Sequence, residues 1–259
     1  MSGFYIGADG KARKVKGGYI GIDGKARKIK KGYIGVNGVA RLCWAAADPV
    51  FANNTWEEIA AACQSGSVPD TWEIGDQKTM TIGSTEYVFD IIGKNHDDYA
   101  DGSGKAPLTF QLHDCYSIKH PMNNAGTNAG GWEQSMMRVP HLVNILSNIP
   151  IKDLIREVTK LTSGGNKSST IVATADKLFL LSEVEVFGNV THSVVGEGSQ
   201  YPYYKNNALT KKWNGANNHW ALRSPVANSS EYFCIVTQNG ATTTGTATYS
   251  QGTSFAFCL

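Results

Sequence analysis

The first 44 residues repeat one pattern of apolar and polar positions with a period of 14 residues. Each of the three units reads Tyr-Ile-Gly-x-Asp/Asn-Gly-x-Ala-Arg, and its tyrosine recurs in register at Tyr5, Tyr19 and Tyr33. The Asp-Gly or Asn-Gly pair in each unit favours a tight turn, because both residues can adopt positive φ. We therefore predict three short β-hairpins in succession. One unit has too little apolar surface to fold alone, so the repeats need stacking, oligomerisation or a partner surface.

The pattern changes after the repeats. Residues 45–52 predict a short linker, and residues 53–259 predict a second, larger domain. That domain opens with a capping box, in which Thr55 precedes a helix and Glu58 follows three residues later. Glycine favours the left-handed conformation at a helix end, so this helix is expected to stop near Gly66.

The rest of the larger domain mixes a few helical patterns with many short strand patterns. In chain order, they predict a hairpin over residues 79–92, a helix with Leu142, Ile145 and Leu146 on one face, a short helix starting at Pro150, strands at 171–173 and 178–186, and short strands over the last 50 residues. Two or three helices among many short strands predict the α+β class.

Composition excludes a membrane span and points to a separate role for the basic N-terminus. No run of about 18 apolar residues occurs, so no membrane span is expected. The start lacks the apolar stretch of a secretory signal, so we expect the protein to be made in the cytoplasm, or to leave by a route other than that signal. Residues 1–44 hold seven Lys and three Arg against two Asp, a net +8, while the whole chain has +2. Such a basic segment on an acidic body usually has its own partner. The basic residues lie in a hairpin repeat without an RNA-binding motif, which favours a solvated strand face over nucleic-acid binding.

Catalytic and metal-binding motifs are not found. The acidic loop at residues 95–102 resembles a calcium loop, but counting from Asp97 puts Tyr99 and Leu108 where a calcium-binding EF-hand needs oxygen ligands, so we expect a hydrogen-bonded turn. His113-Asp114-Cys115 is not a relay, because adjacent strand residues point to opposite faces. The nucleophile-elbow, phosphate-loop and dinucleotide motifs are missing. We predict no enzyme activity, no cofactor and no metal site.

The five cysteines stand far apart in the sequence, without the close pair of a zinc ribbon, and buried free thiols are expected. Apolar neighbours predict that Cys234 and Cys258 are buried and inert. Strand alternation gives a different expectation for Cys234. With Phe233 and Ile235 facing inward, Cys234 would share the outer side with Tyr232.

The C-terminal stretch is polar and almost uncharged. From Ser224 to Leu259 the only charged residue is Glu231, and Thr, Ser, Asn and Gly predominate. Small hydrogen-bonding groups with interspersed tyrosines are typical of adaptable binding loops, although a plain polar β-surface has the same composition. Apolar residues near Trp220 and Phe255 frame the stretch and would hold it rigid. The predicted ligand-binding residues are Asn217, Asn218, His219, Asn228, Ser229, Tyr232, Thr237, Gln238, Thr242, Thr244, Thr246, Thr248 and Tyr249.

Several motifs occur in the order seen in one domain family. They are Trp-Glu-Ile-Gly-Asp at 72–76 with the acidic loop, Gly-Trp-Glu-Gln-Ser-Met-Met-Arg at 131–138, Phe-Leu-Leu-Ser-Glu at 179–183, Trp-Ala-Leu-Arg-Ser-Pro at 220–225, and the Ala-Phe ending at 256–257. In these motifs the chain resembles an uncharacterised family common in gut bacteria and their phages. That family is similar to the C-type-lectin-like fold of formylglycine-generating enzymes and of the variable proteins of diversity-generating retroelements.

The resemblance implies a receptor-binding adhesin of a phage or prophage tail. In the variable proteins, the C-terminal part of the domain displays hypervariable residues that bind receptors. The 14-residue repeats resemble the start of phage tail proteins, which implies that residues 1–44 contact other tail proteins. Tail adhesins are commonly homotrimers, so a trimer located in the virion tail is expected. The host receptor would be a protein or a glycan.

Two departures from the family pattern bear on this expectation. The Glu-Pro-Asn sugar motif of calcium-dependent lectins is missing, and Cys234 and Cys258 are too far apart for the cysteine pair of the formylglycine enzymes. Two alternatives stay open: a structural component of the tail or baseplate, and an oxidase-like enzyme that uses Cys234 or Cys258.

Overall fold

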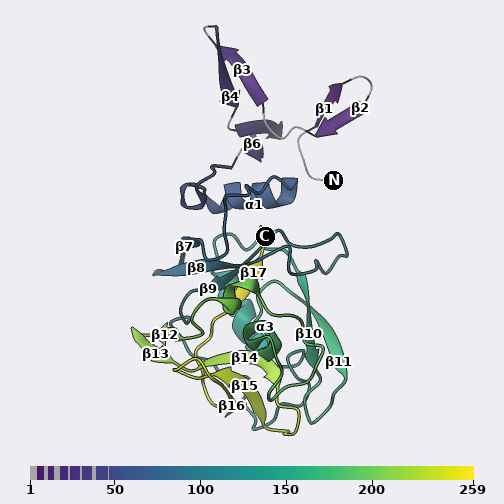
Figure 1. The fold of residues 1–259 in the computed structure, drawn as a ribbon, viewed down its shortest axis with the longest axis vertical. Coiled ribbons are helices and arrows are strands. Elements are labelled where there is room, and N and C mark those ends of the chain that lie inside the picture. Colours follow the sequence, from purple (N-terminus) through teal and green to yellow (C-terminus); the bar gives the residue numbers. More distant parts are fainter. Residues whose placement is uncertain are drawn as a thin grey trace.

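The structure, a computed structural model, describes residues 47–259 continuously and most strands of the N-terminal repeats (5–8, 11–14, 18–22, 24–29, 31–36 and 39–45). It belongs to the α+β class, as the sequence predicts (Figure 1). The elements lie in small antiparallel sheets with a few short helices. The four-stranded sheet and α1 (Trp56–Ser65) lie nearer the N-terminal hairpins, and a three-stranded sheet lies at the opposite end (Figure 1).

The predicted hairpins of the repeats are confirmed by antiparallel pairing. The pairs are β1 (Tyr5–Ala8) with β2 (Lys11–Lys14), β3 (Gly18–Ile22) with β4 (Lys25–Ile29), and β5 (Lys31–Val36) with β6 (Val39–Ala45). Gly24 has a φ of +71°, the conformation that the turn requires. The other turn residues, Asp9-Gly10, Asp23 and Asn37-Gly38, lie outside the described part of the chain.

Helix α1 begins and ends as predicted. Thr55 accepts a hydrogen bond from Glu58 N, and the Glu58 carboxylate accepts one from Thr55 N in return. Gly66 ends the helix with a φ of +62°. The capping box satisfies two of the backbone N–H groups that the start of a helix leaves without partners, those of Thr55 and Glu58.

An aromatic cluster joins α1 to the four-stranded sheet, whose order is β17-β9-β8-β7. The Trp56 ring lies 6.1 Å from Phe89, 5.1 Å from Phe110 and 5.8 Å from Phe257. The strands are β7 (Gln77–Ile82), β8 (Thr85–Lys94), β9 (Leu108–Leu112) and β17 (Ala256–Cys258). The last strand of the chain therefore pairs with β9 at one edge of this sheet, and its residues are buried.

Packing begins before residue 53, within the segment expected as a linker. Phe51 is buried and packs edge-to-face against Trp72 at 5.1 Å, and Trp72 donates a hydrogen bond to Asp48 O at 3.0 Å. Phe51 lies in a short 3-10 helix, η1 (Phe51–Asn53). The limits 1–44, 45–52 and 53–259 stay a prediction, but these contacts attach residues 48–54 to the body.

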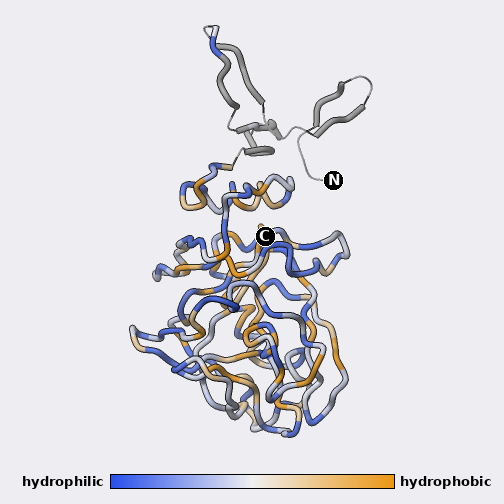
Figure 2. Tube along the Cα trace, in the orientation of Figure 1, coloured by the Kyte–Doolittle hydropathy of each residue, from blue (hydrophilic) through white to orange (hydrophobic). Residues whose placement is uncertain are grey.

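Further strands and short helices complete the body. They are η2 (Met137–Leu142), α2 (Val143–Ser147), η3 (Pro202–Lys205), the hairpin β10 (Val158–Ser163) with β11 (Ile171–Asp176), the hairpin β12 (Lys211–Trp213) with β13 (Ala216–Asn218), and the sheet β14 (Trp220–Pro225), β15 (Tyr232–Val236) and β16 (Thr242–Thr246). Figure 2 shows hydrophobic stretches mainly through the middle of the body and hydrophilic ones in many outlying loops.

Two predicted elements are wrong. Residues 178–186 are not a strand: Phe179 makes one isolated bridge to Ala256, and α3 (Glu183–Phe187) follows. Ser182 and Glu185 form a second capping box, and this local signal outweighs the β-branched residues in the run. Residues 150–154 form turns rather than a short helix.

Candidate functional site

The thirteen predicted ligand-binding residues all lie at the surface, either exposed or half-buried. Tyr249 has 64% of its surface exposed and Tyr232 has 36%. The neighbouring residues Phe233, Ile235 and Val236 are buried. The stretch therefore combines a surface of polar and tyrosine side chains with an apolar support, as its composition predicts.

The structure divides these residues between the two ends of the three-stranded sheet. At one end, which we call the loop end, Tyr232 pairs with Thr246. At the other, which we call the turn end, Val236 pairs with Thr242 on one side and with Trp220 on the other. The loop end holds Asn228, Ser229, Tyr232, Thr246, Thr248 and Tyr249, and the turn end holds Asn217, Asn218, His219, Thr237, Gln238 and Thr242. Thr244 lies between them, so a ligand that contacts both ends must span the length of β16, about 16 Å.

A buried asparagine holds the loop end in place. Asn128 Nδ2 donates to Ser229 O at 3.0 Å and to Tyr232 O at 2.8 Å, and Asn128 Oδ1 accepts from Asn166 N at 2.7 Å. Gly165 lies so close that a Cβ on it would be 1.8 Å from Asn128 O. The buried amide satisfies backbone groups of the loop and fixes its position. Sequence reasoning did not identify this residue.

A carboxylate holds the turn end to α3. Glu183 accepts hydrogen bonds from His192 N, from Ser193 N at 2.8 Å and from Thr242 Oγ1 at 2.8 Å. Burial alone would raise the pKa of Glu183, but these donors lower it below its usual value. The ionised carboxylate thus connects the loop after α3 to the first residue of β16.

The prediction that Cys234 shares an exposed side with Tyr232 is wrong. Cys234 is fully buried, because Glu183 and the loop after α3 cover that side of β15 and leave only Tyr232 at its end exposed. Cys258 is also fully buried, in agreement with the expectation from its apolar neighbours. Burial raises the pKa of both thiols well above the ordinary value.

A cluster of buried charges lies in the interior of the body. Lys160 Nζ is 2.7 Å from Asp97 Oδ1 and 2.7 Å from Glu185 Oε1, and Arg223 holds Glu185 with both terminal nitrogens. Burial alone would raise the pKa of Asp97 and Glu185. Lys160 lowers the pKa of Asp97 below its usual value, and Arg223 and Lys160 together lower that of Glu185. Tyr201 donates its hydroxyl hydrogen to Asp97 as well. The cluster ties the acidic loop, β10, α3 and β14 together.

The acidic loop uses its carboxylates within the protein. Asp97 bonds to the buried cluster, Asp98 pairs with Lys105 at 2.9 Å, and Asp101 pairs with Arg156 at 2.7 Å. Among the described residues, no group of three or more His, Cys, Asp or Glu side chains is placed to hold a metal ion.

The His113-Asp114-Cys115 motif also makes contacts outside itself. His113 Nδ1 lies 2.9 Å from Asp90 Oδ2, and Asp114 accepts from Lys212 N at 2.7 Å. Burial raises the pKa of the Cys115 thiol to about 11. The three side chains therefore bond to other residues rather than to one another, but they lie in the bend after β9 and not on the strand that the sequence predicts.

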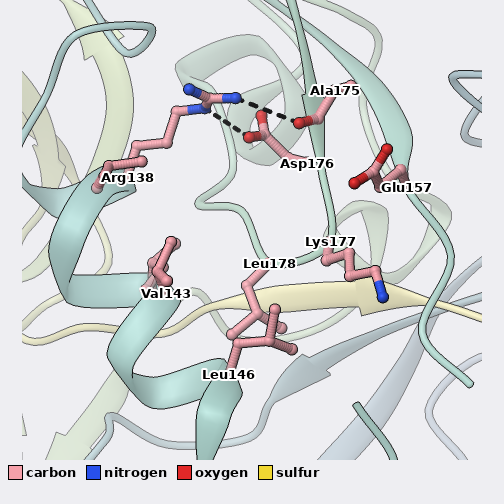
Figure 3. Close-up of a pocket in the computed structure, with 10 residues that line it drawn as sticks. Arg138, Val143, Leu146, Glu157, Ala175, Asp176, Lys177 and Leu178 are labelled. Carbon is pink, nitrogen blue, oxygen red and sulfur yellow. Dashed lines mark hydrogen bonds and ion pairs between the residues drawn. The ribbon is translucent and has the colours of Figure 1, made fainter. Parts of the chain in front are cut away.

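Several hollows lie outside the predicted residues, and two of them border α2 and the β12–β13 hairpin. One, of about 160 Å³, lies between α2 and the end of β11, and Arg138 crosses one side of it (Figure 3). Arg138 donates to Asp176 Oδ1 at 2.6 Å and to Ala175 O at 3.2 Å, so its guanidinium group is held by the wall. The apolar wall contains Val143, Leu146 and Leu178.

The second hollow, of about 270 Å³, borders the β12–β13 hairpin that carries Asn217 and Asn218. Ser117 fixes two aromatic residues of its wall: Tyr87 donates to Ser117 Oγ at 2.8 Å, and Trp213 donates to Ser117 O at 3.0 Å. Neither hollow was predicted, because its walls come from segments far apart in the sequence.

No helix in the described part of the chain is long and apolar enough to cross a membrane. No curated protein and no solved structure matches the chain. One family model matches residues 109–259, from β9 to the C-terminal strand, and this range includes all thirteen predicted residues. The chain therefore belongs to the family described as "Domain of unknown function (DUF6273)".

Proposed function

We propose that this protein is a non-enzymatic receptor-binding adhesin of a phage or prophage tail. Its C-terminal residues would bind a host surface ligand, and residues 1–44 would attach it to other tail proteins. The observation that carries the proposal is the combination of an uncharged polar surface with a rigid support. Asn128 and Glu183 fix the two ends of the sheet while Tyr232 and Tyr249 stay exposed. A fixed scaffold beneath adaptable polar groups is the usual design of a recognition surface.

The position of the three-stranded sheet relative to the N-terminal segment also supports this proposal. The sheet of β14, β15 and β16 lies at the end of the body remote from α1 (Figure 1). A protein attached through its N-terminal segment would thus present this sheet outward. We further propose the C-type-lectin-like fold for the larger domain, with a surface sheet formed by the last 40 residues and a final strand that returns to the first sheet.

Two exposed tyrosines give the proposal its test. Tyr232→Ala and Tyr249→Ala together should leave the protein folded, because exposed substitutions usually cost within about 0.5 kcal/mol each. Binding to host cells should fall by about tenfold or more, since anchor tyrosines contribute about 1–3 kcal/mol. Val50→Ala, at an exposed valine near α1, is the matched control and should bind like the parent. Unchanged cell binding of the folded double variant would place recognition elsewhere.

The enzyme alternative depends on a reactive thiol at Cys234 or Cys258. A thiol acts as a nucleophile through its thiolate, which burial disfavours at both positions. Thiol-labelling reagent should therefore modify these cysteines slowly in the native protein and rapidly after unfolding in urea. Rapid labelling of either cysteine in the native state would favour the enzyme. A structural tail component is the remaining alternative, and it would show no binding to host cells.

A further inference from the structure

β16 is an edge strand of its sheet, whose order is β14-β15-β16. Backbone hydrogen bonds just before and just after β16 show which of its backbone groups face β15. Just before β16, Thr237 N donates to Ala241 O at 2.8 Å, and just after it, Ala247 N donates to Glu231 O at 2.9 Å. Antiparallel strands form their hydrogen bonds at every second residue pair. The residues of β16 that form hydrogen bonds with β15 are therefore Thr243 and Gly245.

This alternation leaves every second residue of β16 with outward-facing backbone groups. The N–H and C=O groups of Thr243 and Gly245 point toward β15. Those of Thr242, Thr244 and Thr246 point away from the sheet. These three threonines are among the residues that the sequence predicts to bind a ligand, and their half-buried or exposed side chains share one side of the strand.

Few of these outward groups have a partner within the described residues. Thr246 O accepts from Tyr249 N at 3.1 Å. The backbone N–H groups of Thr242, Thr244 and Thr246, and the C=O groups of Thr242 and Thr244, have no hydrogen bond to the part of the chain that the structure describes. Their spacing along the strand matches that of a neighbouring β-strand.

The edge also lacks the features that usually prevent strand pairing. Natural edge strands are commonly protected by charged residues, proline or bulges. The sequence of β16 is Thr-Thr-Thr-Gly-Thr, which has none of these residues and favours extended structure.

We propose that β16 binds an extended polypeptide segment of the host receptor by adding it to the sheet as a fourth strand. This inference rests on the proposed adhesin function and specifies a protein receptor. A row of alternating backbone donors and acceptors recognises another backbone. A second copy of this chain fits less well, because the free run is short and polar and offers little apolar area for a stable dimer. The exposed Tyr249 beside Thr246 is placed to anchor one end of the segment.

Two substitutions at Thr244 distinguish the contribution of its backbone N–H to peptide binding from that of its side-chain hydroxyl. Thr244→Pro removes one outward N–H but no hydrogen bond to β15, and edge strands tolerate proline at such a position. Thr244→Val keeps the N–H and removes only the hydroxyl.

A library of random linear 12-residue peptides displayed on phage is selected against the full chain, and the enriched peptide is synthesised. Thr244→Pro should weaken its binding by about tenfold or more, and Thr244→Val by less than about twofold.

Amide hydrogen exchange on the unsubstituted chain provides a second measurement that does not depend on how Thr244→Pro folds. The amides of Thr242, Thr244 and Thr246 should exchange fast in the free protein and at least about tenfold more slowly with the peptide bound. The inference is overturned if no peptide is enriched, if these amides gain no protection, or if the folded Thr244→Pro protein binds normally. It is also overturned if the chain is a dimer that Thr244→Pro converts to monomers, since β16 would then bind a second copy.

Host-cell binding distinguishes failure of this inference from failure of the adhesin function. If the parent chain and both Thr244 variants bind cells equally well, the adhesin function stands and strand addition is wrong. If the parent binds no cells, the adhesin function fails, while the peptide and exchange results still decide whether β16 accepts a strand.

Discussion

Lys160 neutralises two carboxylates that have no access to solvent. Its ammonium nitrogen is 2.7 Å from Asp97 and 2.7 Å from Glu185, and all three side chains are about 3% exposed. Lys160→Met leaves both carboxylates in the interior without this cation, which should reduce the free energy of unfolding by about 3–5 kcal/mol. Lys105→Met is the control, because the Lys105–Asp98 pair is solvent-exposed and such pairs contribute about 0–1 kcal/mol. Urea unfolding measures both, and equal losses would contradict the role of burial.

Glu197 gives a different residue-specific effect, one that depends on pH. Its side chain is buried and accepts hydrogen bonds from Ser163 N and Ser224 Oγ, and burial raises its pKa to about 7. The folded protein therefore takes up a proton below pH 7 that the unfolded chain takes up only near pH 4.5. The stability from this group is fully present below pH 4.5 and is lost as the pH rises through 7.

The variant Glu197→Gln should remove this dependence. Relative to the parent, it should be more stable at pH 8 than at pH 5, because only the parent must bury a negative charge at high pH. Urea unfolding at both pH values measures the difference, and comparison with the parent cancels the contributions of the other titrating groups. A difference that does not change between pH 5 and pH 8 would show that Glu197 titrates normally.

The loop between β14 and β15 depends on the close contact of Gly165 with Asn128. Gly165 has a φ of +68°, and Gly102 has a φ of +72° with open space around it. Alanine at either position should cost about 1–2 kcal/mol for the backbone conformation. Gly165→Ala should cost clearly more, because the new Cβ would collide with Asn128 O.

Gly165→Ala should also speed amide exchange around Ser229 and Tyr232, whereas Gly102→Ala should not affect it. The free energy of unfolding and hydrogen exchange test the two parts of this prediction. Similar behaviour of both alanine variants would mean that Asn128 does not support the loop.

Local signals explain which elements could be predicted from the sequence. The capping box of Thr55 and Glu58 and the turn before β8 depend on residues close together in the chain, and both were predicted. Residues 178–186 were misassigned because the apolar run 178–181 is buried by distant segments rather than by pairing in a sheet. The Ser182–Glu185 capping box is the local signal that indicates a helix there.

The candidate site was likewise predictable only in part. Composition predicted that residues such as Thr248 and Tyr249 would lie at the surface, because a polar stretch cannot form a core. Composition could not predict the division into a loop end and a turn end, since this depends on the register of β14, β15 and β16. Asn128 and Glu183 lie 101 and 59 positions away in the sequence from the groups that they hold, so local patterns do not reveal their roles.

The arrangement of the chain places its two proposed interactions at opposite ends. The edge strand β16 lies remote from α1, whereas α1 lies on the side of the N-terminal hairpins (Figure 1). Separation of this kind lets several copies associate through residues 1–44 while each sheet stays free to bind. Several weak receptor contacts on one particle would then increase the overall affinity through effective concentration.

Self-association through residues 1–44 is the last prediction. A 14-residue hairpin unit exposes its tyrosine and isoleucine on a narrow strand pair, and adjacent copies can cover these residues. The full chain should therefore form oligomers at micromolar concentration, a trimer on the family resemblance, and a chain beginning at Asp48 should be a monomer. Light scattering measures both masses, and circular dichroism checks that the shorter chain is folded. Because residues 1–44 carry a net +8, added salt should screen repulsion between copies and favour the oligomer. Monomers for both chains at low and high salt would show that the repeats bind a different protein.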